Sequence, residues 1–229
     1  MKKILVVQSR VTEDRIERER ENYRRAIGGK ADADFLSAVD SSLAWTTPDA
    51  LLEGYDGVIF GGSSDFDFHG GRPAEDPMRL MSTIILSRAK NLVNYTVTQA
   101  IPVLGICFGH QLIAEMHDGR VSNDGMQSKK GAFQVELTEE GKKDVLLGNL
   151  PEKFFAQYEH KDSVTNLPRG ATVLATGAAC RFSALRYGAG FYTTQFHPEL
   201  LRTIEGPESY DSPEASTLIP LWLERVVAA

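Results

Sequence analysis

The chain has 229 residues, of which 42% are hydrophobic and 24% are charged, and its formal net charge is −6 at pH 7. These values are ordinary for a globular protein, and they exclude a disordered chain, a fibrous repeat and a strongly basic nucleic-acid-binding domain. No repeat or linker divides the sequence, so we expect one domain over residues 1–229.

Short apolar runs alternate with longer segments of mixed polarity, and this pattern predicts an α/β fold around a mostly parallel sheet. The first strand is expected at 4–8, and its apolar run is too short for a signal sequence or a membrane span. An exposed, charged helix is expected at 13–27, with a stop at Gly28-Gly29. Its interleaved Arg and Glu residues indicate a solvated, salt-bridged face rather than a basic binding patch.

The middle of the chain continues the alternation of strands and helices. A buried strand is predicted at 55–60, and it ends in Gly61-Gly62. The segment 63–77 is rich in glycine, proline and aspartate, so we expect an irregular surface loop there. A helix at 78–100 and a compact apolar strand at 101–106 follow.

The C-terminal half is predicted to add a small antiparallel part to the sheet, after a helix at 109–116. The expected strands lie at 131–137, 153–157, 172–176, 184–187 and 191–196. Their close spacing favours antiparallel pairing. A segment rich in proline, serine and acidic residues, 205–213, precedes a short terminal helix at 217–227.

Cys107 is the candidate nucleophile, because it follows a predicted strand and has Gly105 and Gly109 on either side. Such a turn needs small neighbours, since the nucleophile adopts a strained backbone and strand and helix pack closely. A cysteine at a helix N-terminus also meets the positive end of the dipole, which favours the thiolate, and nearby N–H groups can bind an oxyanion. A buried structural cysteine is the alternative, and this interpretation fits Cys180, which has no flanking glycines of this kind.

The two cysteines are too few for a disulfide framework, and their spacing forms no CxxC or Cys/His metal motif. A reducing compartment fits this cysteine usage, so the sequence predicts a cytoplasmic protein. We expect it to need no metal or other cofactor, and to have neither nucleic acid nor a membrane as a partner.

A cysteine nucleophile needs a base, and His197 is the best candidate among the five histidines. It ends an apolar strand, and Glu199 follows two residues later, on the same side of an extended chain. Glu199 can therefore orient one ring nitrogen of His197 while the other faces Cys107.

The other histidines are weaker candidates for the base. His160 ranks second, because it has carboxylate neighbours but lies in a polar segment that we expect to be an exposed turn. His110 and His117 lie on the helix after Cys107, where packing or surface roles are favoured. His69 lies in the glycine-rich loop and would approach a substrate only if that loop folded over it.

The paired glycines Gly61-Gly62 at the end of a strand offer a third feature. Their N–H groups could join those after Cys107 in an oxyanion hole. An ordinary tight turn is the alternative. Nucleotide binding is disfavoured, because the segment lacks a Walker lysine and the flanking serines of a pyrophosphate loop.

Taken together, Gly61-Gly62, the run 105–111 (GICFGHQ) and the run 196–199 (FHPE) resemble the class I glutamine amidotransferase family, in the same order. The resemblance extends by motif from about residue 50 to 201. It implies a flavodoxin-like three-layer α/β domain, in which a Cys-His-Glu triad hydrolyses the side-chain amide of glutamine through a γ-glutamyl thioester.

Carried over residue by residue, the resemblance assigns the triad to Cys107, His197 and Glu199 and the oxyanion hole to the N–H groups of Gly62 and Phe108. The resemblance also implies substrate contacts at the following residues: Gly61, Gln111, Glu159, His160 and Lys161. Glu159 stands where the family usually has serine or asparagine, so contacts from the backbone of this last segment are favoured over its side chains.

The partners implied are glutamine or another γ-glutamyl small molecule and a synthetase that consumes the ammonia. Only about thirty residues follow Glu199, too few for a second domain, so the synthetase would be a separate polypeptide. The alternative is a stand-alone γ-glutamyl peptide hydrolase. A catalytically inactive binding or redox-sensing module is less favoured, since a sensor does not need Glu199.

Overall fold

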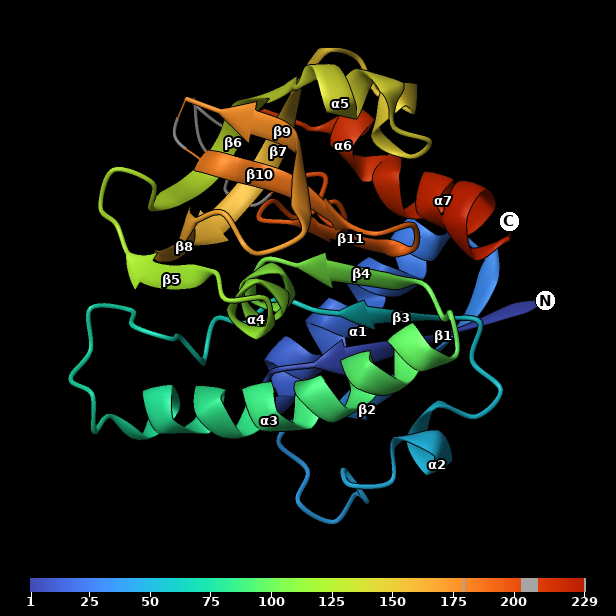
Figure 1. The fold of residues 1–229 in the computed structure, drawn as a ribbon, viewed down its shortest axis with the longest axis vertical. Coiled ribbons are helices and arrows are strands. Elements are labelled where there is room, and N and C mark those ends of the chain that lie inside the picture. The colour runs from blue at the N-terminus through green and yellow to red at the C-terminus, as the bar shows by residue number, and fades with distance from the viewer. Residues whose placement is uncertain (179, 203–209, 229) are drawn as a thin grey trace.

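The structure is a computed structural model that describes residues 1–178, 180–202 and 210–228. A nine-stranded sheet runs through it in the order β2-β1-β3-β4-β11-β10-β9-β6-β7, and helices pack on both of its faces (Figure 1). The predicted α/β architecture is confirmed. Among the described residues, no helix combines the length and the apolar character needed to cross a bilayer.

The sheet has a parallel half and an antiparallel half, and a separate two-stranded antiparallel sheet lies beside it. The parallel half consists of β1 (Lys2–Gln8), β2 (Ala31–Ser37), β3 (Gly57–Phe60), β4 (Val103–Ile106) and β11 (Phe191–Thr194). The antiparallel half consists of β6 (Lys129–Leu137), β7 (Lys153–His160), β9 (Ala171–Gly177) and β10 (Cys180–Tyr187). The two-stranded sheet pairs β5 (Arg120–Asn123) with β8 (Asp162–Asn166).

The helices are of unequal length, and the two longest flank the parallel half of the sheet. They are α1 (Glu13–Ile27), α2 (Pro48–Leu52), α3 (Pro77–Thr98), α4 (Phe108–Met116), α5 (Glu139–Lys143), α6 (Pro213–Ser216) and α7 (Leu218–Trp222). A 3₁₀ turn at Leu147–Asn149 and a π-helical turn at Leu223–Val227 complete the described elements. The terminal helix expected at 217–227 therefore corresponds to α7 and the π-helical turn that follows it. Of the expected segment 205–213, residues 205–209 lie outside the described residues.

The alternation of apolar side chains along β1 builds the two hydrophobic layers of the fold. Ile4 and Val6 face the cluster that includes α1 and α7, whereas Leu5 and Val7 face the cluster that includes α3 and α4. Successive side chains of a strand point to opposite faces, so a central strand that is apolar at every position is buried on both sides. This sandwich fixes the carboxyl ends of β1, β3 and β4 at one edge of the sheet.

Helix α1 is amphipathic, although its sequence is dominated by charge. Gly28 ends it in a left-handed conformation with φ 60°, as predicted from the sequence. The helix is exposed along most of its length, but Glu19, Tyr23 and Ile27 form a buried edge with a spacing of four residues. The expectation of a solvated helix is therefore correct for the outer face and wrong for this inner edge.

Trp222 is expected to be one of the largest contributors to stability. Its side chain is fully buried, and a methyl group added to Gly57 would lie 2.8 Å from its Cη2 atom. Trp222→Ala should therefore lower the free energy of unfolding by about 3–5 kcal/mol, measured by chemical denaturation. Leu80→Ala on the exposed face of α3 is the control, and it should cost less than about 0.5 kcal/mol. Equal losses in the two variants would contradict this account of the core.

Candidate active site

Cys107 lies in a tight strand-turn-helix between β4 and α4. Its backbone has φ 53° and ψ −98°, a conformation that residues other than glycine rarely adopt. Gly109 follows in the helix, where any side chain would clash with the carbonyl oxygen of Phe60. The N–H of Cys107 donates to the carbonyl oxygen of Thr194 at 2.8 Å, so β11 holds the turn in place. The side chain of Cys107 thus projects from the carboxyl edge of the sheet.

His197 and Glu199 form a buried pair directly after β11. His197 Nδ1 and Glu199 Oε1 are 2.7 Å apart, and each residue is only 5% exposed. Burial lowers the pKa of His197, but the interactions with Glu199 and Cys107 outweigh this effect and raise the pKa well above 6.5. His197 Nε2 has no hydrogen-bond partner in the described part of the chain, so this nitrogen can take a proton from a nearby group.

Gly62 lies close to both the imidazole of His197 and the Cβ atom of Cys107. A methyl group built on its Cα would lie 2.8 Å from His197 Cε1 and 3.5 Å from Cys107 Cβ. Only glycine therefore allows Cys107 and His197 to approach the end of β3 together. The Cys107 sulfur also lies 3.7 Å from the carbonyl oxygen of Glu159, which marks the end of β7 as another wall of the site.

Two backbone N–H groups near the Cys107 turn have no acceptor among the described residues. Neither the N–H of Gly62 nor that of Phe108 donates to any of the residues that the structure describes. Phe108 is the first residue of α4, so its N–H carries the positive end of the helix dipole. Gly61 fixes the turn, since its N–H donates to Val7 at 3.0 Å and its carbonyl oxygen accepts from Gly109 at 3.1 Å. The pair can stabilise negative charge on an oxygen.

Arg10 and Glu19 form a second buried ion pair, which was not predicted from the sequence. The Nε and Nη2 atoms of Arg10 lie 3.1 and 3.0 Å from Glu19 Oε1, and its Nη1 donates to Ser64 Oγ at 2.9 Å. Burial raises the pKa of Glu19, although the charge of Arg10 acts in the opposite direction. The spacing of Glu19, Tyr23 and Ile27 on one helix face was the signal that could have revealed the burial of Glu19.

His160 is buried, and the expectation that it lies in an exposed turn is wrong. It is the last residue of β7 and is 8% exposed, with Nδ1 3.0 Å from the carbonyl oxygen of Asp162. Burial lowers its pKa to about 4. Its neighbours Glu159 and Lys161 are exposed, because side chains of a strand alternate between faces. Glu159 pairs with Lys130 at 3.2 Å.

Gln111 lies one helical turn after Cys107 and is buried. Its Nε2 donates to the carbonyl oxygen of Asp162 at 2.8 Å. The carboxylate of Asp162 in turn accepts from the N–H groups of His69 and Gly70 at 2.6 and 2.7 Å. The predicted irregular loop 63–77 is thus tied to the start of β8, close to Gln111. The His69 side chain itself is exposed.

Two clefts meet at His197, and they share Arg10, Ser64 and Glu159 as common walls. The first cleft has a volume of about 510 Å³ and extends along the end of β7 toward Lys161. The second has a volume of about 380 Å³ and extends along α1. No group of side chains able to hold a metal ion occurs among the residues that the structure describes.

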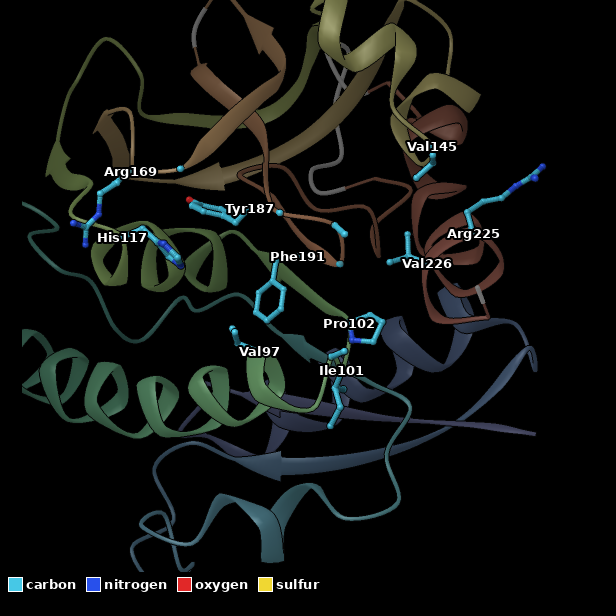
Figure 2. Close-up of a pocket in the computed structure, with 15 residues that line it drawn as sticks. Val97, Ile101, Pro102, His117, Val145, Arg169, Tyr187, Phe191, Arg225 and Val226 are labelled. Carbon is cyan, nitrogen blue, oxygen red and sulfur yellow. The ribbon is translucent and has the colours of Figure 1, made fainter.

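A larger cavity of about 750 Å³ lies at the opposite end of the strands (Figure 2). It is bordered by Ile101 and Pro102, just before β4, and by the turn before β11, so it opens at the amino ends of these strands. Its lining is mostly apolar, and its His117 packs against Tyr187 with ring centroids 4.6 Å apart and an angle of 38° between the rings. None of the described residues that line this cavity carries a thiol or a carboxylate, whereas Cys107, His197 and Glu199 lie at the other edge of the sheet.

The comparisons with known proteins agree on one protein family. Residues 47–212 match the family described as "Glutamine amidotransferase class-I". The glutamine-hydrolyzing GMP synthase subunit of Methanocaldococcus jannaschii is 33% identical over 54% of this chain and 64% of its own length. The protein of the same name from Methanothermobacter thermautotrophicus is 37% identical over 56% of this chain and 67% of its own length. The first match therefore spans less than two thirds of that relative.

A solved structure supports the fold. The crystal structure of a glutamine amidotransferase from Methylobacillus flagellatus superposes with a TM-score of 0.65 and covers 100% of this chain and 93% of that chain. The two sequences are 18% identical, so this likeness concerns the fold alone.

The buried neutral histidine His110 predicts a specific dependence of stability on pH. Its ring is fully buried with Nδ1 2.8 Å from Thr193 Oγ1, and burial lowers its pKa from 6.5 to about 3. Below about pH 6.5 the imidazole of His110 is protonated in the unfolded chain but stays neutral in the folded protein. The free energy of unfolding therefore decreases as the pH is lowered from about 6.5 to the folded pKa of about 3. The slope for one such group approaches about 1.4 kcal/mol per pH unit.

His110→Gln should therefore flatten the pH dependence of the unfolding free energy between about pH 6 and about pH 4.5 by roughly 1 kcal/mol per pH unit. The measurement is urea denaturation at several pH values, compared with wild type. His69→Gln, at an exposed position, is the control and should leave the slope unchanged. Parallel curves for wild type and His110→Gln would contradict the assignment.

Proposed function

Since the chain belongs to the class I glutamine amidotransferase family, we propose that it hydrolyses the side-chain amide of glutamine, or of a related γ-glutamyl compound, through Cys107, His197 and Glu199. The observation that carries this proposal is the contact at Gly62, which brings the buried His197–Glu199 pair next to the Cys107 turn. A nucleophile, a base and a group that orients the base are the parts that cysteine-dependent acyl transfer requires.

The first half of the reaction forms a thioester. The raised pKa of His197 makes its imidazole a stronger base, and Nε2 takes the proton of the Cys107 thiol. The sulfur attacks the γ-carbonyl carbon, and the N–H groups of Gly62 and Phe108 stabilise the oxyanion that develops. His197 then gives its proton to the departing nitrogen, the carbon–nitrogen bond breaks, and ammonia leaves from the γ-glutamyl thioester.

The second half returns the free enzyme. His197 now takes a proton from water, whose oxygen attacks the thioester carbon within reach of the same N–H groups. The carbon–sulfur bond breaks, and glutamate and the Cys107 thiolate are released. Glu199 keeps one ring nitrogen of His197 engaged in both steps, so the other nitrogen carries every proton transfer.

Substrate contacts are proposed in the first cleft. Gln111, which binds the backbone of Asp162, and Gly61 are buried and do not line this cleft, but both are proposed to contact the glutamyl side chain. Glu159, His160 and Lys161 would meet the α-amino and α-carboxyl groups, mainly through their backbone. His160 lies in this wall as a neutral ring and is not the proposed base.

The relatives are subunits of GMP synthase, so we propose that the ammonia passes to a separate synthetase partner. The second candidate is a stand-alone γ-glutamyl hydrolase, which the additional cleft beside His197 favours. An inactive binding or redox-sensing role is disfavoured by the complete set of catalytic groups. One domain and a cytoplasmic location are also proposed, the latter because both cysteines are free and buried.

The central prediction concerns thiol-dependent release of glutamate and ammonia. The assay uses glutamine and a panel of γ-glutamyl amides, with the wild-type protein and with Cys107→Ala, which should reduce turnover by at least about a thousandfold. His197→Ala should have a comparable effect, whereas His160→Ala should retain most activity. Turnover that persists in Cys107→Ala, or is abolished by His160→Ala alone, would refute the assignment.

Gly62→Ala tests the oxyanion turn and its contact with His197. The added methyl group would lie 2.8 Å from His197 Cε1, so the imidazole or the turn has to shift. Because small displacements of catalytic groups are costly, kcat/KM for the best substrate should fall by about a hundredfold. Gly125→Ala is the matched control, since no atom lies within 4 Å of the added methyl group, and it should behave as wild type.

A further inference from the structure

The second cleft has no task in the hydrolysis of glutamine. Hydrolysis of an amide involves an acyl part and an amine part, and the base must reach the nitrogen between them. The first cleft lies against the end of β7 and Lys161, where the glutamyl part is proposed to bind. The second cleft continues past His197 and Glu199 on the side of α1, so it lies where the amine part would leave.

The size of the second cleft exceeds what ammonia requires. Its volume of about 380 Å³ falls within the range of about 300–1,000 Å³ that is common for small-molecule sites. The amine part of glutamine is a single nitrogen, so most of this cleft would stay empty in a glutaminase. A substrate with a larger amine part would occupy it.

Four arginines give this cleft its chemical character: Arg10, Arg15, Arg18 and Arg202. Arg10 is held rigidly, because its side chain is only 14% exposed and pairs with Glu19. Arg18 lies 4.0 Å from Asp14, too far for a hydrogen bond, and it donates to none of the residues that the structure describes. Its guanidinium forms a long ion pair with Asp14 and has N–H donors that no described residue accepts.

The carboxylates that line the second cleft are already engaged. Glu19 binds Arg10, Glu199 binds His197, and Glu159 pairs with Lys130. The acidic partners of the outer arginines are outside the lining of the cleft, since Arg15 pairs with Asp65 and Arg202 with Asp211. Each guanidinium has five N–H donors, more than one carboxylate partner uses.

We infer that the second cleft binds the amine part of a γ-glutamyl compound and that this amine part carries a carboxylate, as in a γ-glutamyl amino acid. A planar guanidinium fork matches a carboxylate with two parallel hydrogen bonds, so arginines suit this group better than they suit a neutral or cationic amine. This inference rests on the proposed function and specifies its substrate class.

The chemistry of the reaction is unchanged by the larger amine part. Cys107 Sγ attacks the γ-carbonyl carbon, and His197 protonates the amide nitrogen as the carbon–nitrogen bond breaks. The free amino acid then leaves through the second cleft, where the arginines hold its carboxylate. Water hydrolyses the thioester, so one water is consumed and glutamate and one amino acid are formed.

The test compares two substrates that differ only in the carboxylate. γ-Glutamylglycine and γ-glutamylmethylamide have similar amine parts, one with and one without this group. Wild type should show a kcat/KM at least about tenfold higher for γ-glutamylglycine, the ratio expected from one charge-assisted contact. In the double variant Arg18→Gln, Arg202→Gln this ratio should fall to about one.

Arg169→Gln is the control, because this exposed arginine borders the cavity at the opposite end of the strands and should keep the wild-type ratio. Binding is measured separately by calorimetry with Cys107→Ala, which should bind γ-glutamylglycine at least about tenfold more tightly than the methylamide.

The outcomes separate this inference from the proposed function. Hydrolysis of glutamine and of both amides without a preference for γ-glutamylglycine would overturn the inference and leave the proposed function standing. A preference that survives in the double variant would also overturn it. Failure of wild type to hydrolyse any γ-glutamyl amide would refute the proposed function and the inference together.

Discussion

The close contact between Gly109 and the carbonyl oxygen of Phe60 is the constraint on which the site depends. Any side chain at Gly109 would clash with that oxygen, so the first turn of α4 can pack against the end of β3 only with glycine at this position. The hydrogen bond from Gly109 to Gly61 then fixes the glycine turn against the start of α4. Together with the bonds from Cys107 to Thr194 and from Gly61 to Val7, this contact holds the Cys107 turn against the glycine turn.

Two buried ion pairs flank the same turn, and their burial requires that they be paired. His197–Glu199 lies on the side of β11, and Arg10–Glu19 lies on the side of α1. An unpaired charge in either place would lose several kcal/mol of hydration, so each partner depends on the other. The nonpolar layers around β1 therefore end at these two ion pairs, and the two clefts meet beside them.

Features governed by local sequence could be predicted, and features that depend on distant partners could not. The end of α1 follows from Gly28, and the pairing of His197 with Glu199 follows from a spacing of two residues. Strand β2 was missed, because alternating aspartates leave no long apolar run in Ala31–Ser37 and only its pairing with β1 identifies it.

In the candidate site, too, the contacts between residues that are distant in the sequence were not predicted. His160 was misjudged because its sequence neighbours are polar, although in a strand those neighbours point away from it. The pairing of Arg10 with Glu19 joins the end of β1 to the inner edge of α1, and the contact of Cys107 with the end of β7 joins segments 52 residues apart. Such contacts follow from the topology of the sheet, which single-sequence patterns do not specify.

The two faces of α1 have different surroundings: one face packs in the hydrophobic core, and the other is exposed. Tyr23 and Ile27 are buried in the core, whereas Arg18 is exposed and lines the second cleft. Substitutions on the outer face remove no buried side chain, so they change the chemistry of the cleft with little loss of stability. The exposed residues of this helix that line the second cleft can therefore change without new compensating mutations in the core.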